Sequence, residues 1–163
     1  MSKKNEFIDK LRSSGLRPTK QRLKICEVLF DRDNTFHFTI NDLAKNISEV
    51  LNEKISLATV YNTVHAFKYK GYLKEISINS DKSYFDTNTT NHHHFFDEDT
   101  NELIDCDEKI IETPKIKRNI SGKIKSFWPN GNIRLSGNYY EGNRSGTFKS
   151  FNEKGEVLLV ENF

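Results

Sequence analysis

The sequence is poor in cysteine, with only Cys26 and Cys106 among 163 residues. Two distant thiols make no disulfide framework. Because there is no Cys-x-x-Cys pair, we also expect no structural zinc site built from four cysteines. Cys26 lies among apolar residues with helical spacing, which predicts a reduced residue of the core.

Long apolar runs and a signal peptide are absent as well. We therefore expect a cytoplasmic protein without a membrane partner. The composition, 35% hydrophobic and 29% charged, predicts small cores. A net charge of +2 does not by itself indicate nucleic-acid binding, but the charge is uneven. Residues 1–24 hold eight basic and two acidic side chains, whereas residues 97–108 hold seven acidic and no basic ones. A basic end can follow phosphates, and an acidic centre can hold cations.

The most informative stretch is residues 55–72, ISLATVYNTVHAFKYKGY. Ser56 can cap a helix whose apolar face is formed by Leu57, Val60, Val64 and Phe67. Gly71 stands where this helix should end, and the next residues alternate like a strand.

The other face of this helix carries Thr59, Tyr61, Asn62 and His65, with Lys68 and Lys70 following. Thr and Asn can contact base edges, Tyr can pack on a thymine methyl group, and Lys can bind phosphate. The pattern is therefore typical of a helix in a DNA major groove. The alternative is an ordinary amphipathic helix with a solvated polar face.

Two further helices precede this one. Gly15 and the residues after it open a helix that runs to Phe30, and Thr39 is a candidate cap for a helix over residues 40–51. A two-stranded wing is expected near residues 73–85. Three helices with a wing make a winged helix-turn-helix, and the whole chain is predicted to be α+β.

Several motifs occur in the order found in one protein family. GLRPTKQRLKI, HFTINDLA, SLATVYNTVHAF, YFD and HHH resemble the ferric uptake regulator family over about residues 11–105. ATVYN and HHHFF are most similar to its iron response regulator branch, which is associated with haem. The resemblance implies a metal- or haem-responsive regulator of iron homeostasis genes that binds double-stranded DNA as a homodimer and is not an enzyme.

The resemblance, together with the helix pattern, gives a set of candidate DNA-binding residues. Asn62 stands where arginine is common in the wider family, so no operator sequence follows. The three basic residues of the set are alternatively solvated surface charges. The set is Arg17, Lys20, Arg22, Ser56, Thr59, Tyr61 and Asn62.

The histidine triplet at residues 92–94 begins a strand-like run, so His92 and His94 point to the same face. Two imidazoles on one face begin a site for zinc, iron or manganese. The resemblance implies one regulatory metal between the DNA-binding and dimerisation domains. Asp86, reached by a one-residue slip, and Asp105 stand where glutamates are usual. The alternative is a solvated run of histidines. The implied ligands are His37, Asp86, His92, His94 and Asp105.

His93 points to the other face of the same strand. It occupies a position where the ordinary family pattern has an aspartate of a second metal site, and Asn91 replaces that site's histidine. A run of three histidines resembles the haem-responsive branch. Haem, with His92, His93 and His94 as candidate ligands, is therefore a second candidate effector, which the histidines alone do not distinguish from a bare ion.

After Asp107 the motifs end and an internal repeat follows. Residues 122–139 and 146–163 match at a period of 24, each copy being two strands around a turn. The pattern is similar to MORN-type repeats. The repeat either packs on the central sheet, pairs with its mate in a dimer, or binds a protein partner. Trp128 is the candidate contact residue for such a partner.

These patterns predict a winged-helix DNA-binding domain at residues 1–83, a truncated metal-binding and dimerisation segment at 84–114, and β-hairpin repeats at 119–163. Two other functions remain open. One is an effector-independent interaction protein that acts through residues 119–163. The other is a metalloenzyme that uses the histidine and aspartate cluster to activate water.

Overall fold

A computed structural model describes residues 2–52, 54–79, 81–106 and 121–163. The chain forms two compact units. The first, which we call the helical unit, comprises Met1–Glu75 and Asp81–Thr89. The second, the sheet unit, comprises Ile76–Ser80 and Thr90–Phe163. In the described part of the chain, none of the helices has the length and apolar character needed to cross a membrane.

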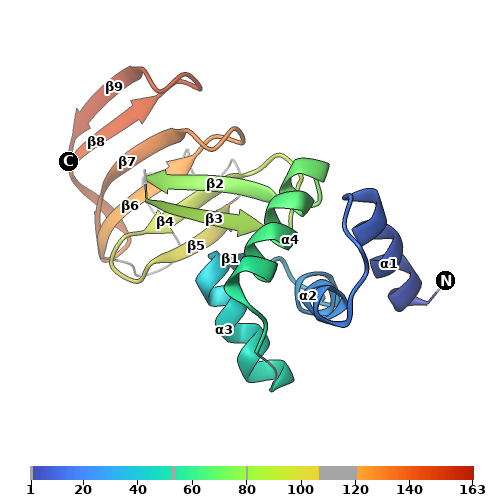
Figure 1. Cartoon of the computed structure of the whole chain (residues 1–163). Coiled ribbons are helices and arrows are strands. Elements are labelled where there is room, and N and C mark those ends of the chain that lie inside the picture. Colours follow the sequence, from blue (N-terminus) through green and yellow to red (C-terminus); the bar gives the residue numbers. More distant parts are fainter. Residues whose placement is uncertain (1, 53, 80, 107–120) are drawn as a thin grey trace. The chain divides into compact units, whose positions relative to one another are not determined.

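The helical unit contains four helices (Figure 1). The three expected helices are present, but the one expected from Gly15 begins only at Lys20, because Thr19 caps it there. A further helix, which the sequence pattern did not predict, spans residues 3–13. A small sheet has the strand order β1-β3-β2. The elements of the helical unit are α1 (Lys3–Ser13), α2 (Lys20–Phe30), β1 (His37–Phe38), α3 (Ile40–Leu51), α4 (Leu57–Lys70) and β3 (Lys82–Asp86). The strand β2 (Lys74–Asn79) begins in this unit, and its residues from Ile76 onward are assigned to the sheet unit.

Side-chain caps fix where α2, α3 and α4 begin, and at the start of α2 the Thr19 hydroxyl accepts from the Arg22 N–H. The Thr39 hydroxyl accepts from the Asp42 N–H, and the Asp42 carboxylate accepts from the Thr39 N–H, which makes a reciprocal capping box. Ser56 accepts from the Thr59 N–H at 3.2 Å, as its sequence position predicts. At the other end of α4, Gly71 has φ +82°, a left-handed conformation that glycine adopts at little cost. The caps of α3 and α4 agree with the helix bounds expected from the sequence.

The core of the helical unit gathers buried apolar side chains from all four helices and from β1 and β3. On α4, Val60, Val64 and Phe67 are fully buried, as predicted. Leu57 is 52% exposed, so its assignment to the apolar face was wrong. It is the first helical residue after the Ser56 cap, where the buried stripe does not extend.

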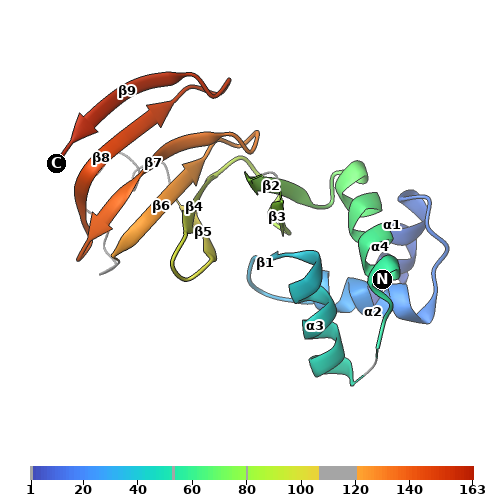
Figure 2. The same ribbon diagram turned by 60° about the vertical axis from the view of Figure 1, so that its left-hand side comes forward.

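The sheet unit is a six-stranded sheet whose neighbouring strands are all antiparallel, in the order β5-β4-β6-β7-β8-β9 (Figure 2). Two strands lie in each copy of the 24-residue repeat. The residues expected between the central sheet and the repeat, among them Asp107, Glu108 and Pro114, lie outside the described residues. The strands are β4 (His93–Asp97), β5 (Glu102–Cys106), β6 (Gly122–Phe127), β7 (Ile133–Tyr140), β8 (Asn143–Phe151) and β9 (Val157–Asn162).

One face of this sheet carries an apolar cluster made of Phe95, Ile124, Leu135, Tyr139 and Phe148. The Phe148 ring packs against Gly137 so closely that a Cβ atom at position 137 would lie 2.6 Å from the ring. The glycine therefore makes room for the Phe148 ring. Because the cluster draws on β4, β6, β7 and β8, it ties the repeat strands to the strand that carries the histidines.

Candidate metal centre and nucleic-acid interface

In the helical unit, β1 and β3 place a histidine opposite an aspartate. The two strands are antiparallel with His37 paired to Asp86, and His37 Nε2 lies 3.6 Å from Asp86 Oδ2. The Asp86 side chain is completely buried, and its Oδ1 accepts from the Asn88 N–H at 2.7 Å. A buried carboxylate requires a proton, a cation or hydrogen bonds. We call His37 and Asp86 the first half-site.

Lys74 lies near this carboxylate, although no motif in the sequence singles it out. Burial lowers the pKa of the Lys74 amine, and the negative charge of Asp86 opposes this shift. Its position on β2, a strand of the same small sheet, explains the proximity. Only the long-range strand pairing brings lysine and aspartate together.

In the sheet unit, two histidines and an aspartate converge. The antiparallel pairing of β4 and β5 places His94 opposite Asp105. Asp105 Oδ1 lies 2.9 Å from His92 Nε2 and 3.4 Å from His94 Nε2, and the two rings have centroids 4.2 Å apart. His94 is completely buried, whereas Asp105 is partly exposed. We call His92, His94 and Asp105 the second half-site.

The His92 ring is oriented by a backbone carbonyl. Its Nδ1 lies 2.9 Å from Thr90 O, and since a carbonyl can only accept, Nδ1 must carry the hydrogen. In the neutral ring Nε2 then has a lone pair that faces a carboxylate. That contact is favourable only if Nε2 holds a proton or a cation lies between the two groups. A metal-binding histidine is commonly oriented in this way.

Within each half-site, the donor spacings fit ligands of one ion. Nitrogen and oxygen donors bind first-row metals at about 2.0–2.2 Å, so adjacent ligands lie roughly 3 Å apart. The second half-site has separations of 2.9 and 3.4 Å, and the first has 3.6 Å. Each of the five predicted ligands offers a ring nitrogen or a carboxylate oxygen that could bind a metal. The imidazole and carboxylate set suits zinc, iron or manganese.

His93 is directed to the opposite face of β4. It pairs with Cys106, its Nδ1 lies 3.0 Å from Phe127 O, and its ring contacts Trp128 edge-on at 5.6 Å. The structure therefore does not bring His93 together with His92 and His94. A haem ligand set that uses all three would need both faces of one strand.

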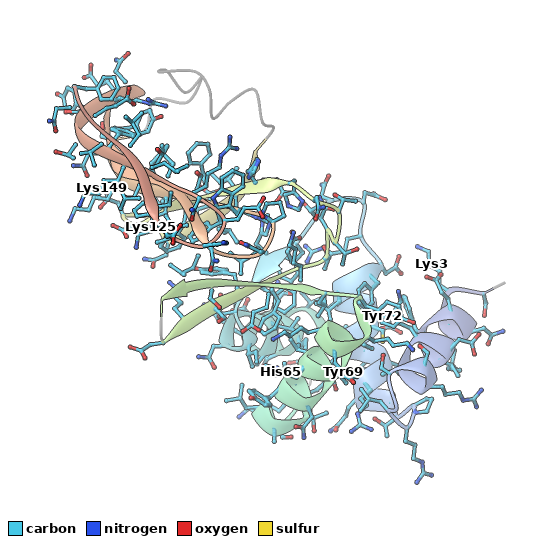
Figure 3. All side chains as sticks on the ribbon, turned by 90° about the horizontal axis from the view of Figure 1, so that it is seen from above. Lys3, His65, Tyr69, Tyr72, Lys125 and Lys149 are labelled. Atoms are coloured by element: carbon cyan, nitrogen blue, oxygen red, sulfur yellow. The ribbon has the colours of Figure 1, made fainter. Side chains whose placement is uncertain are left out.

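The outward face of α4 presents aromatic and apolar side chains to solvent. Tyr61 is 51% exposed and Tyr69 is 94% exposed, and Asn62 is exposed beside them. The Tyr61 ring contacts the His65 ring with centroids 4.1 Å apart and planes tilted by 40°, and His65 meets Phe85 edge-on. Figure 3 shows His65 and Tyr69 on α4. This face can meet bases through aromatic surface and one amide.

Two candidates at the start of α4 are engaged with each other. The Ser56 and Thr59 hydroxyls lie 2.8 Å apart, so both help to form the cap. At the far end Lys68 pairs with Glu75. Burial raises the pKa of Glu75, but hydrogen bonds from Lys68 and Ser83 and the Lys68 charge outweigh it and hold the pKa below its usual value. Lys68 is therefore committed to a carboxylate, which weakens its expected role with phosphate.

The basic candidates of α2 and the preceding loop are only partly clustered. Arg17 and Lys20 are exposed. Arg22 is half-buried, and its Nη1 donates to Arg17 O at 3.0 Å, so it holds the loop before α2. Arg22 thus positions Arg17, whose own guanidinium is exposed.

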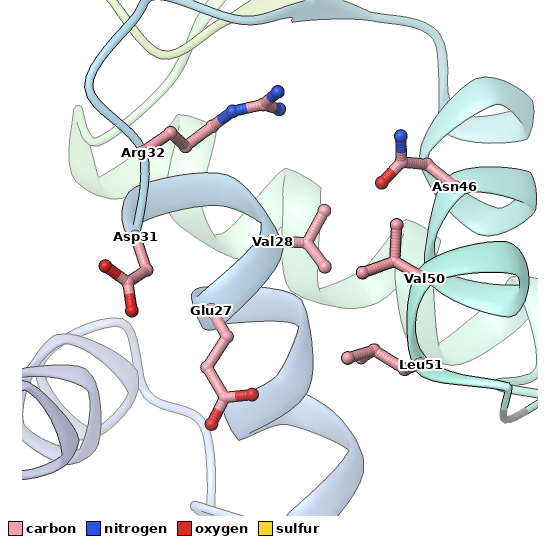
Figure 4. Close-up of a pocket in the computed structure, with 7 residues that line it drawn as sticks. All are labelled: Glu27, Val28, Asp31, Arg32, Asn46, Val50 and Leu51. Carbon is pink, nitrogen blue, oxygen red and sulfur yellow. The ribbon is translucent and has the colours of Figure 1, made fainter.

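A cavity of about 360 Å³ lies between α2 and α3 (Figure 4). Val28, Val50 and Leu51 line one part of it, and Glu27, Asp31 and Arg32 bring charges to another. It contains no histidine and none of the candidate DNA-binding residues. The metal and DNA candidates therefore lie elsewhere.

Trp128 and Cys26 both make contacts within the fold. The Trp128 indole N–H donates to Phe151 O at 2.9 Å, and Arg134 lies over its ring at 4.7 Å. The half-buried Trp128 thus joins the two repeat copies. Cys26 is fully buried, as predicted, and burial raises the pKa of its thiol to about 12.

The sequence profile of the Ferric uptake regulator family matches residues 13–126. This match extends past Asp107, where we expected the resemblance to end. The ferric uptake regulation protein of Vibrio parahaemolyticus is 35% identical over 133 residues, which cover 81% of this chain and 87% of that protein.

Two solved structures of similar fold are also ferric uptake regulators. The Vibrio cholerae ferric uptake regulator, whose structure reveals a rearrangement of its DNA-binding domains, is 34% identical, covers 64% of this chain and 79% of that one, and gives a TM-score of 0.55. The Pseudomonas aeruginosa ferric uptake regulator with manganese is 28% identical, covers 65% and 78%, and gives 0.52.

Proposed function

The chain belongs to the ferric uptake regulator family, and on this premise we propose that it is a metal-responsive transcription regulator that binds double-stranded DNA as a homodimer. The observation that carries the proposal is the pair of half-sites, one in each unit, formed by five histidine and aspartate side chains. Genes of iron homeostasis are the proposed targets.

The DNA-binding part is proposed to be a winged helix-turn-helix. In it, α4 reads bases, α2 and α3 support it, and β2 with β3 forms the wing. Support comes from the exposed Tyr61 and Asn62 on α4 and the exposed Arg17 and Lys20 before and at the start of α2. We retain the division into a DNA-binding domain at residues 1–83, a metal-binding and dimerisation segment at 84–114, and MORN-like repeats at 119–163.

One divalent ion is proposed to bind both half-sites. Each half-site alone supplies two or three donors, fewer than the four to six that zinc, iron or manganese takes. An ion held by both would couple the two units, since binding favours the arrangement in which all donors reach it. When bound, it would neutralise Asp86 and Asp105 and remove the need for a proton on His92.

Haem is the alternative effector, because we propose a likeness to the iron response regulator branch. With His93 on the other face of β4, haem would use His92 or His94 alone. A Soret shift that is lost in His92→Ala would favour haem. A divalent ion that binds without haem affinity would place the chain with metal sensors.

The proposal is tested by selecting sequences from random double-stranded DNA with purified protein and Mn²⁺, then titrating a selected duplex with and without the ion. We expect affinity that requires the ion and falls steeply with salt, because phosphate contacts release counterions. His37→Ala should lose the ion dependence. Equal affinity with and without Mn²⁺, Zn²⁺, Fe²⁺ or haem would contradict the proposal.

A second candidate is an effector-independent interaction protein that acts through residues 119–163. The exposed apolar side chains of β9 favour it. This candidate predicts no salt-dependent DNA affinity. The same DNA selection therefore distinguishes the two functions.

A further inference from the structure

The last strand of the sheet unit is unusual in being exposed along its whole length. Every residue of β9 is exposed, and the strand is mostly aliphatic. Soluble proteins rarely leave so many neighbouring large apolar side chains in water without a binding role. The exposed fractions are Val157 55%, Leu158 64%, Leu159 52%, Val160 50% and, just after the strand, Phe163 55%.

The exposed side chains lie on both faces of the sheet, because successive residues of a strand point to opposite sides. Leu159 is paired with Ser150 and Val160 with Lys149, which belong to different faces. A partner that covered one face would leave the other in water. A strand added to the edge would contact both.

The backbone of β9 can accept such a strand. β9 is the last strand in the sheet order, with β8 as its neighbour (Figure 2). Gly146 and Phe163 exchange both backbone hydrogen bonds at 3.0 Å. In an antiparallel pair these bonds alternate, so Glu161 and Leu159 also face β8, whereas Val160 and Asn162 turn their N–H and C=O outward. No proline and no lysine, the usual protection of sheet edges, occurs between Val157 and Asn162.

We propose that the partner is β9 of a second copy of this chain, added antiparallel across a two-fold axis at Val160. This inference rests on the proposed function, in which two copies bind one DNA site. In this register Val160 lies opposite the mate's Val160, and Leu159 lies opposite Glu161. No two like charges oppose each other, and the outward backbone groups of both edges are satisfied.

The test is the oligomeric state of the full chain, measured by sedimentation without metal or DNA. The parent chain should be a dimer, and Val160→Glu should be a monomer because two carboxylates would oppose each other. Within one chain the new carboxylate would face Lys149 on β8 (Figure 3), which favours the hairpin. Tyr140→Glu, at a 64% exposed site on β7, is the matched control and should stay dimeric.

A charge-swap experiment distinguishes loss of the interface from misfolding of a variant. Val160→Lys alone should also be monomeric, but mixing it with Val160→Glu should restore dimers if the two side chains oppose each other. A monomeric parent, a dimeric Val160→Glu, a monomeric Tyr140→Glu, or a mixture that stays monomeric would overturn the inference. Because the readout involves neither DNA nor metal, failure of ion-dependent DNA binding leaves this result intact. A dimeric Val160→Glu would overturn the interface at β9 and leave the proposed function standing.

Discussion

His92 Nε2 lies 2.9 Å from Asp105 Oδ1 while the opposite ring nitrogen of His92 donates to the Thr90 carbonyl. The carbonyl sets which nitrogen faces the aspartate, and the facing pair then needs a proton or a cation between its two atoms. The backbone turn before β4 thus orients His92 for the role of metal ligand that we propose.

Replacing Asp105 with asparagine should weaken divalent metal binding. The amide keeps the shape but removes the negative charge beside His92 and His94. Changing a residue that only supports a metal ligand costs about 10- to 100-fold in affinity, so we expect at least this loss here. Calorimetric titration with Mn²⁺ and Zn²⁺ measures the change. Asp99→Asn removes the same charge from an exposed site on the same hairpin and should have no effect. Equal affinities for the two variants would exclude Asp105 as a ligand.

Tyr61→Ala should reduce DNA affinity without reducing stability. The side chain is 51% exposed and contacts the His65 ring, so its loss removes contact surface and leaves the core intact. We expect a loss of about 1–2 kcal/mol in binding free energy. Fluorescence anisotropy with a selected duplex measures it, and Tyr140→Ala serves as an exposed tyrosine outside the helical unit. A large drop in melting temperature would instead place Tyr61 in the core.

Cys26 should resist alkylation in the native protein. Its pKa of about 12 lies above the ordinary value of 9.0, so the folded state favours the neutral thiol. The sign follows: stability from this group is fully present below pH 9 and is lost as the pH rises toward 12. Iodoacetamide at pH 8.5 should modify Cys26 only after urea is added, as read by peptide mass spectrometry. Rapid native modification would contradict the burial.

Gly71→Ala should destabilise the helical unit. A Cβ atom at this position would meet no neighbour within 4 Å, so the cost comes from the backbone at φ +82° and should be about 1 kcal/mol. Urea unfolding measures it. Gly71→Asn should cost less, because asparagine tolerates the left-handed region better. Alanine and asparagine variants as stable as the parent would show that this conformation is not required.

Local chemistry explains which features could be predicted from sequence. Thr39 and Ser56 as caps, and Gly71 as a helix end, depend on residues within four positions along the chain, and the structure confirms them. The alternation of His92 and His94 follows from strand geometry alone. Leu57 failed because spacing shows which side of a helix is apolar but not how far along the helix the core reaches.

Contacts that depend on the pairing of strands could not be predicted from the sequence. Lys74 lies near Asp86, and Lys68 pairs with Glu75, because the fold brings these residues together. Neither contact follows from a spacing pattern in the sequence. Family resemblance implied that His37 and Asp86 are ligands of one metal, but their pairing in neighbouring strands is not a property of either segment alone. The exposure of β9 likewise depends on its place at the end of the sheet order.

The most direct test of the central claim is the number of metal ions bound, with one variant in each half-site. Calorimetry with Mn²⁺ should give one ion per chain for the parent. His37→Ala and His94→Ala should each weaken that same ion by a similar large factor, and the double variant should lose little more, because ligands of one ion act together. His93→Gln should bind as the parent does. Two ions per chain, or a His37→Ala variant that binds normally, would contradict a metal held by both half-sites.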